Sequence, residues 1–136
     1  MRSMRAQVTV DFLIVLVAVS LLFASVFSVF LTKTQAMART NAELAGIRVA
    51  EKVASEAQLL VLDGNGSTAT VFLHALPTNE NYTLYLSGRF VSISLFTPEG
   101  TREFNVPLPA NVSTAASKRQ GEQLALVFKE GLLHAS

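Results

Sequence analysis

Residues 12–31 read FLIVLVAVSLLFASVFSVFL, a run of 20 amino acids without a charged side chain. At about 1.5 Å of rise per residue, a helix of this length spans roughly 30 Å, the thickness of the hydrocarbon core of a bilayer. Half of the 136 residues are hydrophobic and only 15% are charged, whereas soluble proteins carry about a quarter of charged residues. We therefore predict a transmembrane helix and exclude a purely cytosolic globular protein.

The residues before the apolar run, 1–6, form a short basic leader with Arg2 and Arg5. Positive charge that precedes an apolar span favours leaving that end in the cytoplasm. Basic residues on the far side weaken this bias; they are Lys33, Arg39 and Arg48. We expect a single-pass protein of the cell membrane with a cytoplasmic N-terminus.

A second helical pattern follows the hydrophobic helix of residues 7–35. Residues 32–62 contain no proline and one glycine, and at 100° per residue most apolar side chains between 47 and 61 fall within one half of the helical wheel. That half consists of Ile47, Val49, Ala50, Val53, Ala54, Ala57, Leu60 and Val61, with Leu44 and Leu59 as exceptions. The pattern predicts an amphipathic helix over 36–62, which continues from the apolar helix and ends at Asp63-Gly64-Asn65-Gly66.

From Ser67 the apolar period changes from 3.6 to 2, which is typical of strands. Expected strands are 67–76, 82–86, 89–96, 101–107 and 123–129, with turns at Ser87-Gly88 and Thr97–Gly100 and a surface excursion over 110–121. A sheet of about 70 residues is marginal alone and needs a second layer, for which the apolar face of 47–61 is suited. The predicted fold class is α+β: a long N-terminal helix, transmembrane and then amphipathic, packed on a small antiparallel β-sheet head, residues 63–136.

The start of the apolar run carries a recognisable motif, Arg5-Ala6-Gln7-Val8-Thr9-Val10-Asp11. This stretch resembles the class III signal peptide of archaeal type IV pilins and pilin-like proteins. That signal peptide has a basic leader, a glutamine, a small hydroxyl residue two places after it, an acid four places after it, and then an apolar helix. The resemblance covers about 25 of the 136 residues. Ala6 stands where the family more often has glycine, Thr9 where it has serine and Asp11 where it has glutamate, so size or charge class is kept.

The resemblance implies how such a chain is processed and used. A membrane-embedded prepilin peptidase would cleave between Ala6 and Gln7 on the cytoplasmic side. The hydrophobic helix would stay on the mature subunit, rest in the lipid bilayer before assembly, and then form the core of a surface filament with copies of itself or with other pilins. A helix followed by a β-sheet is the pilin layout, and the implied role is adhesion or a related surface function.

Asp11 has two interpretations. A carboxylate carried to the bilayer centre costs about 2.5–3.5 kcal/mol, so a buried one needs a partner. The resemblance implies that Asp11 pairs with the α-amino group that cleavage creates on Gln7 of a neighbouring subunit. Alternatively, Asp11 marks the membrane interface in the first helical turn, where the helix dipole favours an anion.

Small residues form a stripe at i+4 spacing, namely Ser20, Ala24, Ser28 and Thr32. Small side chains allow helix backbones to approach closely, and hydroxyls bond across such contacts. The stripe therefore predicts a face for packing against another subunit. The alternative is that small residues are common in any membrane helix.

Three N-x-S/T sequons lie beyond the apolar run, beginning at Asn65, Asn81 and Asn111. None has proline at its middle position, and all three fall in predicted loops or at strand edges. The pattern is typical of N-linked glycosylation on an exported head.

The residues that carry catalysis are scarce. The chain has no cysteine, two histidines (His74 and His134) and a net charge of +1. We predict no catalytic site, no metal site, no cofactor and no nucleic-acid partner, because neither the ligands nor a basic patch are present. His74 is expected to be structural, on a strand, and His134 to lie in a disordered C-terminus.

The leading hypothesis is thus a non-enzymatic subunit of an archaeal type IV pilus-like filament. The alternative from another class is a monomeric single-pass membrane-anchored protein with an extracellular β-rich binding domain. A secreted protein with a removed signal peptide is a third possibility, but the 20-residue run exceeds the usual apolar region of about 7–15 residues.

Overall fold

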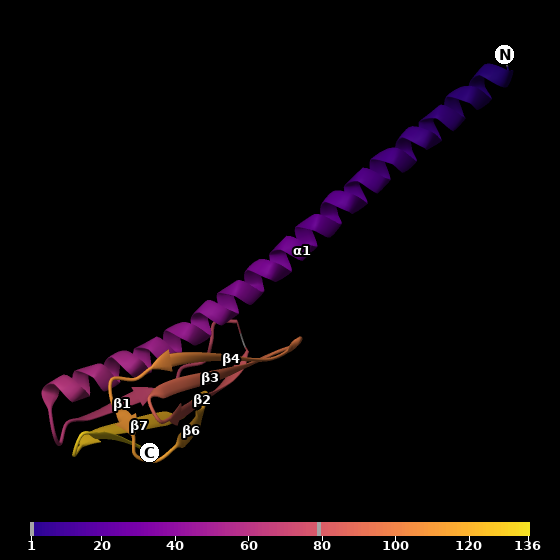
Figure 1. Cartoon of the computed structure of the whole chain (residues 1–136). Helices are drawn as coiled ribbons and strands as arrows, with labels where there is room; N and C mark the ends of the chain where they lie inside the picture. The colour runs from indigo at the N-terminus through magenta and orange to yellow at the C-terminus, as the bar shows by residue number, and fades with distance from the viewer. Residues whose placement is uncertain (1, 79) are drawn as a thin grey trace. The chain divides into compact units, whose positions relative to one another are not determined.

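The chain combines one long helix with a β-rich head and is therefore an α+β protein (Figure 1). The computed structural model describes residues 2–78 and 80–136, and the side chains of 2–7 lie outside that description. Helix α1 covers Arg2–Asp63. The strands are β1 Thr68–Phe72, β2 Asn81–Ser87, β3 Phe90–Thr97, β4 Gly100–Pro107, β5 Asn111–Val112, β6 Ala116–Arg119, β7 Gln123–Lys129 and β8 Leu132–Ala135.

Contacts divide the chain into two compact units, Met1–Arg39 and Thr40–Ser136. Helix α1 contributes to both units, since its last 24 residues, 40–63, belong to the second one. We call the second unit the head. The predicted segments 1–6, 7–35, 36–62 and 63–136 were drawn from composition instead, and they remain a prediction.

The head contains two four-stranded sheets, with strand orders β1-β7-β8-β5 and β4-β3-β2-β6. Neighbouring strands are antiparallel except for the pair of β5 and β8, which is parallel. The prediction of one small antiparallel sheet was therefore wrong in part. Residues 110–121, expected as a surface excursion, contain β5 and β6, and β6 pairs with β2 through Thr83 and Arg119. A short, half-exposed edge strand such as β6 is too polar to stand out from a loop.

Two of the connections are two-residue hairpin turns between neighbouring strands of the second sheet. Thr97 pairs with Gly100 around Pro98-Glu99, as predicted, and the Thr97 hydroxyl donates to the Gly100 carbonyl at 2.7 Å. The turn expected at Ser87-Gly88 lies one residue later, because Ser87 pairs with Phe90. Gly88 has a φ of +57°, which glycine adopts without strain at the first central position of such a turn.

The first sheet differs from the prediction at β1 and at β8. Strand β1 ends at Phe72 instead of residue 76, because the backbone of Leu73 bonds to the turn at Gly121 and Glu122 and leaves the ladder. Strand β8 was not predicted at all. It follows β7 through a turn at Glu130-Gly131, where both residues have positive φ.

The apolar face of the helix in the head is confirmed. The buried positions are 42, 46, 50, 53, 57 and 60, a spacing of three or four residues that lies on one side of a helix. Leu44 and Leu59 are exposed, as their positions on the wheel indicated. Arg102 of β4 forms an ion pair with Glu43, which joins the sheet to the first turns of this helix segment. Gly64, with a φ of +90°, follows the last helical residue.

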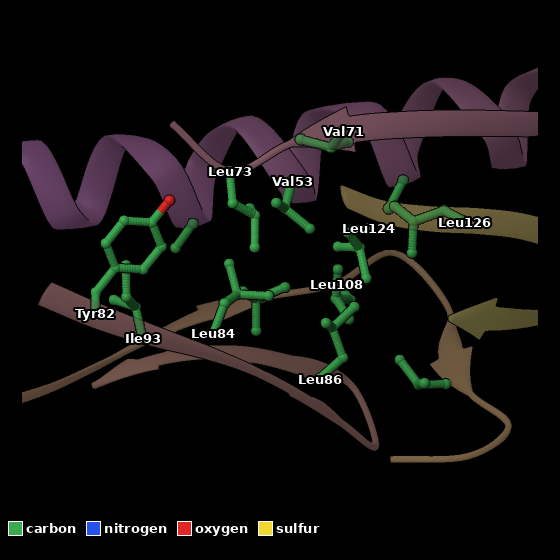
Figure 2. Packing of buried hydrophobic residues seen from close by; sticks show 14 of the residues in the cluster. Val53, Val71, Leu73, Tyr82, Leu84, Leu86, Ile93, Leu108, Leu124 and Leu126 are labelled. Atoms are coloured by element: carbon green, nitrogen blue, oxygen red, sulfur yellow. The ribbon is translucent and has the colours of Figure 1, made fainter. Parts of the chain in front are cut away.

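The core lies between the helix, the first sheet and the second sheet (Figure 2). Val53 of the helix and Leu124 and Leu126 of β7 face the side chains of β2 and β3. In β3 the buried Val91, Ile93 and Leu95 alternate with the half-buried Ser92 and Ser94. Phe104 and Val106 of β4 are only half-buried, since β4 is an edge strand. The buried Tyr82 brings a hydroxyl to this core, and that hydroxyl donates to the His74 carbonyl at 2.9 Å.

Candidate functional site

The first unit presents an apolar surface that nothing in the structure covers. Every residue from 8 to 31 is exposed, and the large apolar side chains range from 46% exposed at Leu31 to 75% at Phe23. The described residues contain one helix that is long and apolar enough to cross a membrane by length and composition. Apolar surface of this extent is unfavourable in water and requires lipid or another apolar surface against it.

Asp11 is the single charged residue between Arg5 and Lys33. It lies exposed on α1 at the N-terminal end of the apolar run, and nothing in the part of the chain that the structure describes pairs with its carboxylate. Four residues of helix separate it from Gln7, a rise of about 6 Å. The side chains of Ala6 and Gln7, the predicted processing residues, lie outside the described ones, although their backbone is helical.

The predicted stripe of small residues lies on the exposed surface of the apolar helix. Ser20 donates its hydroxyl to the Leu16 carbonyl at 2.8 Å, and Thr32 donates to the Ser28 carbonyl at 2.9 Å. Ser25 and Thr34 bond in the same way to residues four positions earlier. These hydroxyls are satisfied within their own helix, and they are therefore compatible with hydrocarbon around them.

Around Ser20 and Ala24 the helix surface has a shallow trough of about 450 Å³. Its other lining residues are Val19, Phe23 and Phe27. The two phenylalanines flank the small residues on the helix surface. Their i,i+4 spacing places both rings on one side of the helix.

The three sequon asparagines are all exposed in the head, but they form no common site. Asn65 lies in the turn after the helix, and its carboxamide oxygen accepts a hydrogen bond from the Glu130 amide at 3.0 Å. Asn81 is the first residue of β2 and lines a hollow on the second sheet. Asn111 is the first residue of β5.

Neither histidine lies where the sequence predicted. His74 follows β1 instead of lying within a strand, and its ring packs edge-on against Phe72 with centroids 4.8 Å apart. His134 belongs to β8, so the prediction of a disordered C-terminus was wrong. Its Nδ1 lies 2.9 Å from the Ser113 hydroxyl, on an exposed surface. A nucleophilic triad needs a third group that orients the imidazole, and none is recorded against His134 within the described residues.

The described residues contain no group of three or more His, Asp or Glu side chains that could hold a metal ion. Residues 8–34 instead combine an exposed apolar surface with one acidic residue, Asp11, and with the serine and threonine hydroxyls that bond to carbonyls of their own helix. The length and composition of this segment are those of a membrane-spanning helix. Comparison with models of protein families, with curated proteins and with solved structures finds no match to this chain.

Proposed function

We propose that this chain is a structural subunit of an archaeal type IV pilus-like surface filament, which assembles through its hydrophobic N-terminal helix. The observation that carries the proposal is a single acid, Asp11, at the start of an exposed apolar helix that continues into a folded β-rich head. The resemblance of the leader and of Gln7-Val8-Thr9-Val10-Asp11 to the class III signal peptide supports it. The role of the filament is adhesion or a related surface function.

The same apolar surface serves two states of the subunit. Before assembly, lipid covers residues 8–31, with the leader in the cytoplasm and the head exported. In the filament, the helices of neighbouring subunits replace the lipid. Because lipid tails are as apolar as leucine, the gain on assembly comes from packing and polar contacts, which small residues promote. The trough at Ser20 and Ala24 supplies a close approach of this kind.

Asp11 gives the assembly its register. Cleavage after Ala6 leaves an α-amino group on Gln7, and a filament buries this amine among apolar helices. The carboxylate of a neighbour's Asp11 neutralises it there. The pair forms only when two helices are offset correctly along the filament axis, so that one acid selects the stagger of the subunits.

The alternative, a monomeric membrane-anchored protein with a binding head, uses the same helix but needs neither cleavage nor the acid. Sequencing of the mature N-terminus separates the possibilities. A start at Gln7 supports the filament subunit, a start at Met1 the anchored monomer, and a start beyond about Ser25 a secreted protein with a removed signal peptide.

The substitution Asp11→Ala tests the assembly role. Removal of one partner of a buried ion pair typically costs about 3–5 kcal/mol, because the other charge stays unpaired. We expect the variant to reach the membrane with a folded head and to be absent from sheared filaments. Asp11→Glu keeps the charge and should restore assembly.

Asp63→Ala is the matched control, because Asp63 is the other aspartate of the chain and lies exposed at the end of α1. It should assemble normally. Electron micrographs that show normal filaments built from Asp11→Ala protein would refute the assembly role. Normal filaments are the result expected if Asp11 only marks the membrane interface.

A further inference from the structure

The outward face of the second sheet has a hollow of about 470 Å³ at one end. It extends across β3 and β2 to the turn that follows β6, and its lining residues are Asn81, Tyr82, Thr83, Phe96, Arg119 and Gln120. Tyr82 points into the core instead, since its side chain is buried. The hollow therefore combines an aromatic ring with hydroxyl, amide and guanidinium groups, within the size range of small-molecule sites.

Strand register explains why Asn81 and Phe96 meet in this hollow. They are directly paired residues of the antiparallel strands β2 and β3. Side chains of such a pair leave the same face of the sheet, with Cβ atoms about 4.5–5.5 Å apart. Thr83 lies two residues along β2, on that face, and pairs with Arg119 of β6. Phe96 remains 48% exposed, so a flat apolar surface stands beside the Asn81 amide.

We propose that Asn81 carries an N-linked glycan whose first sugar lies in this hollow against Phe96. Asn81-Tyr82-Thr83 is an N-x-T sequon, and Asn81 is exposed. The C–H face of a pyranose ring is apolar and stacks on the Phe96 ring, while the Thr83 hydroxyl and the Arg119 guanidinium bond to the sugar's oxygen atoms. The proposal rests on the export of the head that the proposed function includes.

The attachment is a glycosyl transfer from an isoprenoid-linked sugar phosphate or pyrophosphate. The Asn81 amide nitrogen forms a bond to C1 of the sugar and loses one proton. The bond between C1 and the phosphate oxygen breaks, and the lipid phosphate leaves with its electron pair. No oxidant or reductant is involved, and the transferase that uses this lipid-linked donor acts on the exported side of the membrane.

Phe90 provides a matched control for Phe96. Both are phenylalanines on the outward face of β3, and Phe90 is 53% exposed. Phe90 lies at the opposite end of the strand, paired with Ser87 and Pro107, and it does not line the hollow. Replacement of either ring removes a similar exposed apolar area, so that a difference between the two variants reports the contact with the sugar.

The experiment uses the full chain, produced once in a host that attaches N-linked sugars to exported proteins and once in a host that does not. Glycopeptide mass spectrometry should find the sugar on Asn81. The glycosylated form should unfold about 4 °C higher than the sugar-free form in the same detergent, the response of a domain of this size to one added contact. In Phe96→Ala, glycosylation should raise the unfolding temperature by less than half as much, although Asn81 is still modified. In Phe90→Ala, glycosylation should raise the unfolding temperature as much as in the parent. The variant Asn81→Gln measures how much glycans at Asn65 and Asn111 contribute to the rise in unfolding temperature.

Protease treatment of intact cells separates the failure of this proposal from that of the proposed function. An exported, protease-accessible head with unmodified Asn81 overturns the glycan alone. A head that stays protected inside the cell overturns both. If Asn81 is modified but glycosylation raises the unfolding temperature of Phe96→Ala as much as that of the parent, the sugar does not lie in the hollow.

Discussion

Tyr82 is a buried residue with a polar hydroxyl group. Its side chain is only 1% exposed, and its hydroxyl donates to the His74 carbonyl at 2.9 Å. Burial raises the pKa of Tyr82 to about 12, from about 10 for a free tyrosine, because the phenolate would lose its hydration. The hydrogen bond also connects β2 of the second sheet to the segment that follows β1 of the first sheet.

This residue makes the stability of the head depend on pH in the alkaline range. Below pH 10 the tyrosine is protonated in both states and contributes no slope. Between pH 10 and about 12 the unfolded chain releases the proton first, so the free energy of unfolding falls as pH rises. Tyr82→Phe should lower stability by about 1 kcal/mol at pH 8, since the His74 carbonyl loses its donor, and should flatten the alkaline fall.

Thermal unfolding of the full chain in detergent, measured from pH 8 to 12, checks both parts. Tyr85→Phe is the control, because Tyr85 lies on the outward face of the same strand and is exposed. It should retain the alkaline fall. An identical slope in Tyr82→Phe and the parent would contradict the assignment to Tyr82.

Among the elements, the hairpin of β7 and β8 contains an unusual residue. Glu130 has a φ of +54° and is followed by Gly131 at +78°. Two positive values in a two-residue turn are typical of type I′, which favours Asn-Gly. The left-handed conformation costs a residue with a Cβ roughly 1–2 kcal/mol, and the hydrogen bond from the Glu130 amide to Asn65 holds the turn in place.

We therefore expect Glu130→Asn to stabilise the head by about 0.5–1 kcal/mol, because asparagine tolerates positive φ and the amide donor is unchanged. The melting temperature should rise by a few degrees. Glu130→Ala removes the same carboxylate without relieving the backbone, and it should bring no gain. An equal rise in both variants would show that the carboxylate, rather than the backbone, is the source of the strain.

At the scale of the whole molecule, the head contains the entire buried core of the described residues. The buried apolar residues all lie between Ala42 and Leu133, inside the unit Thr40–Ser136. Nothing in residues 8–31 is buried. The head therefore has its own core, and we expect it to fold without lipid.

Residues 40–136 alone should be soluble, with a mixed α and β circular-dichroism spectrum and one cooperative unfolding transition. Residues 64–136 are the comparison, because they lack the helix segment and its buried side chains, Ala42, Ala50, Val53, Ala57 and Leu60. This shorter chain should fail to unfold cooperatively. A disordered spectrum for residues 40–136 would contradict an independent head.

The sequence alone determined the features that depend on local composition and period. The uncharged run of 12–31 requires an apolar surrounding, the face of 47–61 predicts its own burial, and Pro98-Glu99-Gly100 favours one tight turn. Asp11 stands out for the same reason, as the single charge of a long apolar segment. Neighbours within a few residues create each of these signals, so no distant contact was needed to recognise them.

Only the tertiary structure decided how the strands divide into two sheets and which surface residues share a hollow. β5 and β6 are two and four residues long, and their polar side chains favour a loop until β8 and β2 supply backbone partners. Asn81 and Phe96 are 15 positions apart and meet only through the register of β2 and β3. A strand's hydrogen bonds lie between chain segments, whereas a helix makes its own within a turn. The helix could therefore be predicted from the sequence, and the pairing of the strands could not.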